Sequence, residues 1–212
     1  MPHFRMSALK WLMAWDPFNV TEDADLGMRL ARSGYRCAVL PSTTYEEAPL
    51  RLSSWLRQRT RWLKGYVQTW LVHMRFPRKL WRDLGPVGFL GFQTVVGGTT
   101  LSALVHPWFY VLAGIDVALG SLLTRPGSLL GWPFWGVAWF DLLTGYLASM
   151  ALGFMSAQRR GYRHLLKDVL LMPTYWLLIS VAAYRAVWQF MTARFEWEKT
   201  EHGEAALGTA SR

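Results

Sequence analysis

The side chain of this sequence best suited to act as a general base is Asp23, in the motif Thr21-Glu22-Asp23. A carboxylate can take the proton of an attacking hydroxyl when it is held rigidly beside that hydroxyl. The ordinary alternative is helix capping, with Thr21 as the N-cap and the two acids complementing the helix dipole. The two interpretations are compatible, because a helix start also holds the carboxylate in place. Asp23-Ala24-Asp25 has the spacing of a metal-binding pair, but residues two apart on a helix point about 200° apart and would not converge on one ion.

A second motif, QRTRW at residues 58–62, has side chains suited to binding phosphate and sugar. In a helix Gln58, Arg61 and Trp62 share one face, because their spacing is i, i+3 and i+4. Arg61 offers a planar bidentate donor for a pyrophosphate, Gln58 can hydrogen-bond hydroxyls, and Trp62 is a flat apolar surface for a pyranose ring. Gly65, one turn further on, is expected to leave that face open to a ligand. The ordinary alternative is surface charge with a membrane-anchoring Trp.

The composition indicates a protein that works with a lipid bilayer rather than with nucleic acid. The 212 residues are 52% hydrophobic, include 13 Trp and carry a formal net charge of +9. Trp is enriched at membrane–water interfaces. Residues 51–82 contain no acid, and their apolar residues recur at helical spacing, as in a helix that lies in the interface plane. The basic residues of this stretch are Arg51, Arg57, Arg59, Arg61, Lys64, Arg75, Arg78, Lys79 and Arg82.

Residues 1–50 are predicted to be the C-terminal portion of an α/β domain. A short helix is expected over Ser7–Met13, and a second helix starts after Thr21 and ends at Gly34. A strand is expected over Tyr35–Leu40, where the single cysteine, Cys37, would be a buried and inert thiol. About 50 residues with one or two strands cannot bury a core of their own. We therefore expect this region to pack on a further domain.

The apolar stretches after residue 50 predict a mainly α membrane protein. Thr99–Leu123 and Leu129–Met155 are each long enough to cross a bilayer, which takes about 20 residues. The basic loop at residues 158–163 follows them, and the positive-inside rule places that loop in the cytoplasm. The expected divisions are an α/β remnant at residues 1–50, amphipathic interfacial helices at 51–98, transmembrane helices at 99–155, a basic loop and a further helix at 156–192, and a tail at 193–212.

The last apolar block, Leu165–Met191, is ambiguous. It is long enough to span, but Pro173 splits it and Arg185 falls inside it, where a charge at the bilayer centre costs about 3 kcal/mol or more. We favour a broken helix in the cytoplasmic interface, which gives two crossings; three or four result if further blocks span. In this topology the protein lies in the inner (plasma) membrane, and residues 1–98 and the C-terminal tail are cytoplasmic.

The two motifs, in this order and directly before apolar spans, resemble the TED and QxxRW signatures of bacterial processive family 2 glycosyltransferases, the cellulose-synthase-like membrane enzymes. The resemblance implies transfer of a sugar, with inversion, from a nucleotide-sugar donor to a growing polysaccharide or glycan acceptor, coupled to export. It implies that Asp23 is the base, that Trp62 holds the acceptor sugar and that Arg61 helps to bind the diphosphate. Glu22 and Gln58 are expected in the same substrate site.

The tail Phe195–Gly203 resembles, in its placement, the gating loop of cellulose and hyaluronan synthases, and in that role Lys199 and Thr200 would reach phosphate. The resemblance implies that residues 1–50 are the C-terminal remnant of a GT-A type α/β glycosyltransferase domain, whose donor-binding strands and metal-binding DxD precede the TED motif. A divalent cation, Mg²⁺ or Mn²⁺, is therefore expected in the complete enzyme, with ligands outside this chain. We expect the chain to be a fragment or half of a split enzyme, with negligible transferase activity alone, and its partners to include the missing N-terminal half or other synthase subunits.

Two other functions remain open on these residues. A non-catalytic membrane assembly module, or a truncated pseudoenzyme, would keep the shape of a synthase without its turnover. A small transporter or channel is a weaker alternative, since residues 1–80 would then have no role. The five histidines have no metal-ligand spacing, and no phosphate-binding or dinucleotide-binding glycine motif is present.

Overall fold

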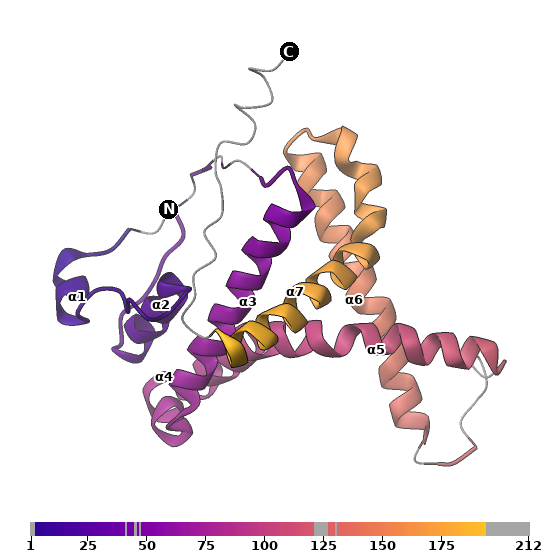
Figure 1. The fold of residues 1–212 in the computed structure, drawn as a ribbon, viewed down its shortest axis with the longest axis horizontal. Helices are drawn as coiled ribbons and strands as arrows, with labels where there is room; N and C mark the ends of the chain where they lie inside the picture. Colours follow the sequence, from indigo (N-terminus) through magenta and orange to yellow (C-terminus); the bar gives the residue numbers. More distant parts are fainter. Residues whose placement is uncertain are drawn as a thin grey trace. The chain divides into compact units, whose positions relative to one another are not determined.

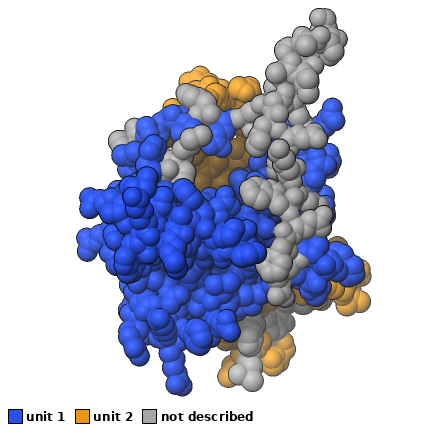
Figure 2. Space-filling view, turned by 60° about the vertical axis from the view of Figure 1, so that its left-hand side comes forward, with its two compact units in different colours: residues 1–104, 181–212 blue, residues 105–180 orange. Residues whose placement is uncertain are grey.

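The computed structural model describes residues 3–40, 42–44, 46, 48–120, 127–129 and 131–193. The chain divides into two compact units, residues 1–104 with 181–212 and residues 105–180 (Figure 2). Within the described residues every regular element is a helix, which agrees with the expected mainly α class. The elements are α1 Met6–Trp11, α2 Glu22–Arg32, α3 Leu52–Met74, α4 Pro77–Phe92, the π-helix η1 Gln93–Gly98, α5 Thr99–Ala118, α6 Gly131–Arg159, the 3₁₀ helix η2 Arg163–Leu171 and α7 Met172–Thr192 (Figure 1).

Helices α1 and α2 form where the sequence predicts them. Three acids occupy the first turn of α2 and two arginines its last turn, an arrangement that suits the helix dipole. Gly34 follows the helix with a φ of +78°, the left-handed conformation that glycine adopts readily at a helix end. A small core joins the two helices through Ala8, Leu26 and Leu30.

The predicted strand at Tyr35–Leu40 is wrong. These residues have no regular structure, and Val39 is 95% exposed. Cys37 is exposed as well, so its predicted burial is also wrong. An extended segment becomes a strand only when a neighbouring strand pairs with its backbone groups, and the described residues supply none. An apolar run of six residues is a local signal, whereas strand formation requires a partner.

The helix predicted from the periodicity of the basic stretch is confirmed as α3. Helix α4 and the π-helix η1 pack against the C-terminal half of α3 (Figure 1). The core of this region consists of Leu80, Phe92 and Val96. Trp70 of α3 packs against them and donates its indole hydrogen to Gln93 Oε1 at 2.9 Å. This core holds α3 in place for the basic motif that it carries.

Residues 77–118 form one helical run in which a kink separates two helices within α4. It bends at Gly85, whose φ is +67°, because Pro86 lacks the N–H that a continuous helix needs. The expected boundary after Gly98 is instead the change from the π-helix η1 to α5. The predicted boundary after Gly98 is therefore present as a change of helix geometry.

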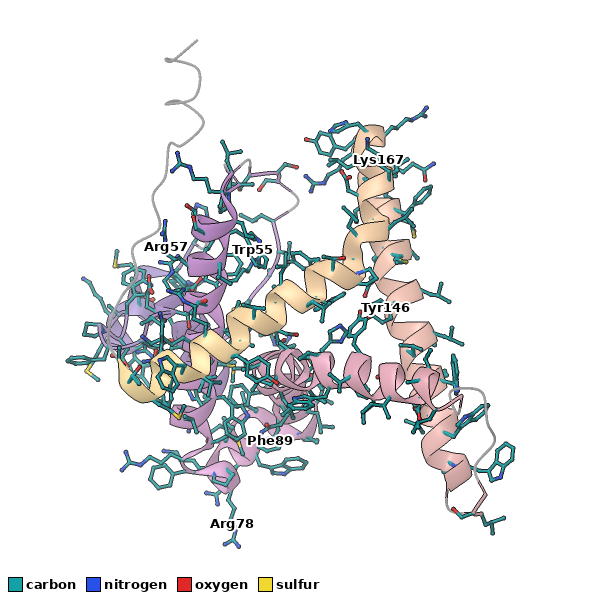
Figure 3. The ribbon with its side chains drawn as sticks, turned by 45° about the vertical axis from the view of Figure 1, so that its right-hand side comes forward. Trp55, Arg57, Arg78, Phe89, Tyr146 and Lys167 are labelled. Atoms are coloured by element: carbon teal, nitrogen blue, oxygen red, sulfur yellow. The ribbon has the colours of Figure 1, made fainter. Side chains whose placement is uncertain are left out.

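Three helical stretches are long and apolar enough to cross a membrane: Pro77–Ala118, Gly131–Arg159 and Arg163–Thr192. The third changes from 3₁₀ to α geometry between Leu171 and Met172, next to Pro173, where the sequence predicts a break; its place in the interface stays a prediction. Within the second unit, Tyr146 of α6 meets His106 of α5 at 3.0 Å (Figure 3). The length and apolar character of the three helical stretches support membrane association.

Candidate substrate site at the start of helix α2

The loop before α2 lies directly on α3. Asn19 donates its side-chain amide to Thr69 Oγ1 at 3.0 Å, and the backbone N–H of Val20 donates to Gln68 Oε1 at 3.2 Å. Thr21 is the N-cap residue, but its side chain makes no capping bond; its hydroxyl bonds to Asn19 Oδ1 instead. The acidic motif is therefore held by buried polar contacts to α3 rather than by the side-chain cap that the sequence predicts.

Thr21 also meets Gly65 of α3. A Cβ atom built on Gly65 would lie 2.1 Å from Thr21 Oγ1 and 2.3 Å from its Cγ2, so only glycine fits here. The prediction that Gly65 leaves room for a ligand is wrong, because Thr21 takes that room. Gly65 is one turn after Arg61 on the same helix face. The structure thus brings the acidic motif to the face of α3 that carries the basic motif.

The two carboxylates of the acidic motif differ in their accessibility. Asp23 is exposed, and its Oδ1 accepts a hydrogen bond from the backbone N–H of Ala24 at 2.9 Å. Glu22 is half-buried. Asp25 is buried on the side of α2 opposite to Asp23, so the two aspartates point apart as the helical spacing predicts.

In the basic motif, Trp62 is 40% exposed and already has a cation over its ring. The Arg59 guanidinium lies 4.5 Å from the centroid of Trp62 and 5.7 Å from that of Trp55, which Figure 3 shows on the N-terminal half of α3. Gln58 and Arg61 are half-buried. A sugar that stacks on Trp62 would use the ring face that Arg59 leaves open, or displace Arg59.

The C-terminal part of α7 contacts the same helix. Buried Lys64 donates to the backbone carbonyl of Ala193 at 2.6 Å, and Arg185 donates to Thr60 Oγ1 at 3.3 Å. Arg185, which makes Leu165–Met191 ambiguous as a span, therefore has a protein partner. The predicted site residues Lys199 and Thr200 lie outside the described residues.

An ionic network around the buried side chains of Asp25 and His73 ties α2 to α3 and α4. Asp25 accepts from Arg29 at 2.7 Å and meets His73 Nε2 at 3.1 Å. Arg32 bonds to Asp83 at 2.7 Å and meets His73 Nδ1 at 3.0 Å. Because arginine can only donate, Nδ1 is the accepting nitrogen, and His73 donates its Nε2–H to Asp25. Each polar group in the network has a partner of the correct kind.

Burial alone would raise the pKa of the Asp25 carboxyl. The hydrogen bond from His73 and the charge of Arg29 outweigh burial and hold that pKa below its ordinary value of 3.8. The folded state therefore keeps this carboxylate ionised at a pH where the unfolded state has begun to protonate it.

Asp25→Asn is expected to lower the free energy of unfolding at pH 7 by about 3 kcal/mol, because it removes the buried carboxylate that pairs with half-buried Arg29 and with His73. Well above pH 3.8 both states of the wild type are ionised, and the contribution that comes from the difference in pKa is complete. It is lost as the pH falls through 3.8 and then through the lower pKa of the folded state. Unfolding midpoints of the detergent-solubilised protein, measured from about pH 3 to pH 7, should show a smaller difference between the variant and the wild type at the acid end. Asp168→Asn, which changes an exposed carboxylate on η2, is the matched control and should match the wild type throughout.

Arg29 has a second set of partners in the turn before the acidic motif. It donates to the backbone carbonyls of Leu12 at 2.7 Å and Ala14 at 2.8 Å. In this turn Met13 and Ala14 have φ values of 58° and 59°, a left-handed conformation that is unfavourable for residues with a Cβ. The network thus holds in place the strained turn that leads to Trp15.

The described residues do not fit the divalent cation that the resemblance implies. No group of three or more His, Cys, Asp or Glu side chains among them could hold a metal ion. The buried carboxylate of Asp25 is taken by Arg29 and His73.

Sequence reasoning missed the network around His73. The spacing of Asp25 and Arg29, four apart on one helix, was the only local signal for it. Nothing local connects His73 to Asp25, since 48 positions separate them. The pairing is a property of how α2 packs on α3.

Comparison with known proteins defines the class. The model of glycosyl transferase family group 2 matches residues 3–193, and the chain belongs to that family. The probable glycosyltransferase YdaM of Bacillus subtilis (strain 168) is 37% identical over 62 residues, which cover 29% of this chain and 15% of that protein. The matched stretch thus spans a small part of the relative's length. No solved structure matches the chain at a significant level.

Proposed function

We propose that the chain is the acceptor-side and membrane part of an inverting, cellulose-synthase-like glycosyltransferase. It would transfer a hexosyl group from a nucleotide-sugar donor to a growing polysaccharide or glycan. The contact of Thr21 with Gly65 carries this proposal, because it joins the acidic and basic motifs within the stretch that matches the family. One motif alone would be ordinary helix chemistry; the two together offer a proton acceptor and a binding face for phosphate and sugar.

The chemistry assigned to these residues is a single displacement. The acceptor hydroxyl oxygen forms a bond to the anomeric carbon while the bond from that carbon to the nucleotide diphosphate breaks. Asp23 takes the hydroxyl proton, and its exposure at a rigidly held helix start supports that role. Arg61 would stabilise the charge on the departing diphosphate, and Trp62 would hold the acceptor ring.

The helical stretches support a place in the membrane for this reaction. Three of them are long and apolar enough to span a membrane. Helix α3, with its basic side chains, comes directly before the first of the three. We propose that residues 1–98 and the tail lie in the cytoplasm of an inner-membrane protein, where nucleotide sugars are made. The growing polysaccharide would then leave through the membrane helices.

Sugar incorporation by native membranes tests the proposal. Membranes from cells with the gene intact are expected to transfer label from one member of a panel of nucleotide sugars into polymer. Deletion of the gene should abolish incorporation and its return should restore it. Incorporation that is unchanged after deletion would contradict the proposal. An assembly module would also fail the deletion test, and the Asp23→Asn variant separates that alternative from catalysis.

A further inference from the structure

We propose that a shallow depression beside the acidic motif binds one sugar ring of the acceptor glycan. The depression has a volume of about 290 Å³, at the small end for ligand pockets. Its lining residues come from the loop before α2 and from the first turn of that helix: Trp15, Asp16, Pro17, Asn19 and Glu22. The inference rests on the proposed function, since it names the substrate that the depression receives.

Trp15 supplies the surface on which a sugar ring would lie. Its side chain is 45% exposed, a large apolar area to leave in water. The ring of Phe4 stands nearly perpendicular to it, at 81° and 6.1 Å between centroids, and so restrains the indole. A restrained, accessible indole presents a flat apolar face, which matches the C–H face of a pyranose.

The acids of the depression favour a neutral, hydroxyl-rich ligand. Glu22 forms no hydrogen bond or ion pair among the described residues, and Asp16 uses one oxygen to accept from the N–H of Phe18 at 2.9 Å. Their remaining oxygens can accept from sugar hydroxyls. The side chain of Asn19 already forms hydrogen bonds with Thr69 and Thr21, so it contributes to the shape of the depression rather than to sugar binding. No lining residue is basic, so the diphosphate of a donor would be repelled here, whereas an acceptor glycan would not.

The depression is held in shape by the buried network. Trp15 follows the left-handed residues Met13 and Ala14, and Arg29 binds the carbonyl of Ala14 while Asp25 holds Arg29 from the buried side. Strained backbone that its surroundings maintain is common at ligand sites. Arg29 and Asp25 are therefore positioning residues, because they hold in place the turn that carries Trp15, on whose ring the sugar would lie.

The test is binding of fluorescent cello- and chito-oligosaccharides to the purified full chain in lipid nanodiscs. Trp15→Ala is expected to weaken binding about tenfold or more, as for loss of an aromatic anchor, while Trp15→Phe keeps most of it. Glu22→Gln should weaken binding less. Trp11→Ala is the matched control, because Trp11 is 66% exposed and does not line the depression; it should bind as the wild type does.

The outcomes separate this inference from the proposed function. If Trp15→Ala binds oligosaccharide as tightly as wild type does, the depression is not the site, although transfer by native membranes would still support the function. Absence of oligosaccharide binding by the wild type, with transfer intact, also overturns the inference alone. If neither binding nor transfer is seen, both are overturned. Unfolding midpoints identify a variant that does not fold, in which case Trp15→Phe and Glu22→Gln decide.

Discussion

Asp23→Asn is expected to abolish sugar transfer while leaving the protein folded and inserted in the membrane. Removing a general base lowers rates by about 10²–10⁴-fold. The asparagine amide keeps an oxygen at the position of Oδ1, which accepts from the backbone N–H of Ala24, so the start of α2 is preserved. The exposed side chain has no buried partner whose loss would destabilise the fold.

This variant is best measured in the chromosomal gene, with incorporation of labelled sugar by native membranes as the readout. Immunoblots of membrane fractions report the amount of inserted protein. Asp168→Asn, which removes an exposed carboxylate far along the chain on η2, is the control and should keep wild-type incorporation. Normal incorporation by Asp23→Asn would remove Asp23 as the base and favour the non-catalytic assembly module.

Gly65→Ala is expected to damage both stability and transfer. The new Cβ would lie 2.1 to 2.6 Å from three atoms of Thr21, which is short, β-branched and buried, so it cannot swing aside. Overpacking of this kind costs about 1–3 kcal/mol. The strain would also push the acidic motif away from α3 and from the basic motif, so transfer should fall even in the protein that remains folded.

Two further variants make the Gly65 test specific. Gly27→Ala is a matched control within α2, because nothing lies within 4 Å of its added Cβ; it should be neutral or stabilising by about 0.5–1 kcal/mol. Thr21→Gly in the Gly65→Ala background removes the clashing side chain and should recover part of the stability, giving a positive coupling in a double-mutant cycle. Equal unfolding midpoints for Gly65→Ala and Gly27→Ala would contradict the contact.

The parts of the fold that sequence predicts well are those whose cause is local. Apolar residues at three- and four-residue spacing predict α3, and structure confirms it. Gly34 ends α2 because glycine takes a left-handed φ readily, and the last helical stretch changes geometry beside Pro173. Each of these features depends on residues within about a turn or two of one another.

The predictions that failed are those whose cause is a partner distant in the sequence. Tyr35–Leu40 has strand-forming residues but no strand to pair with among the described residues, and Cys37 is exposed for the same reason. The hydroxyl of Thr21 bonds to Asn19 rather than capping its helix, because the loop packs on α3. The roles of the predicted site residues stay predictions.

By itself the sequence determined which side chains can do chemistry, Asp23 in one motif and Gln58, Arg61 and Trp62 in another, and that helices carry them. Only the tertiary structure decided how the motifs meet. Thr21 occupies the space that Gly65 leaves, and His73 lies against Asp25 across 48 positions. The physical reason is that helix formation follows from local spacing and capping, whereas contacts between helices follow from the packing of whole faces.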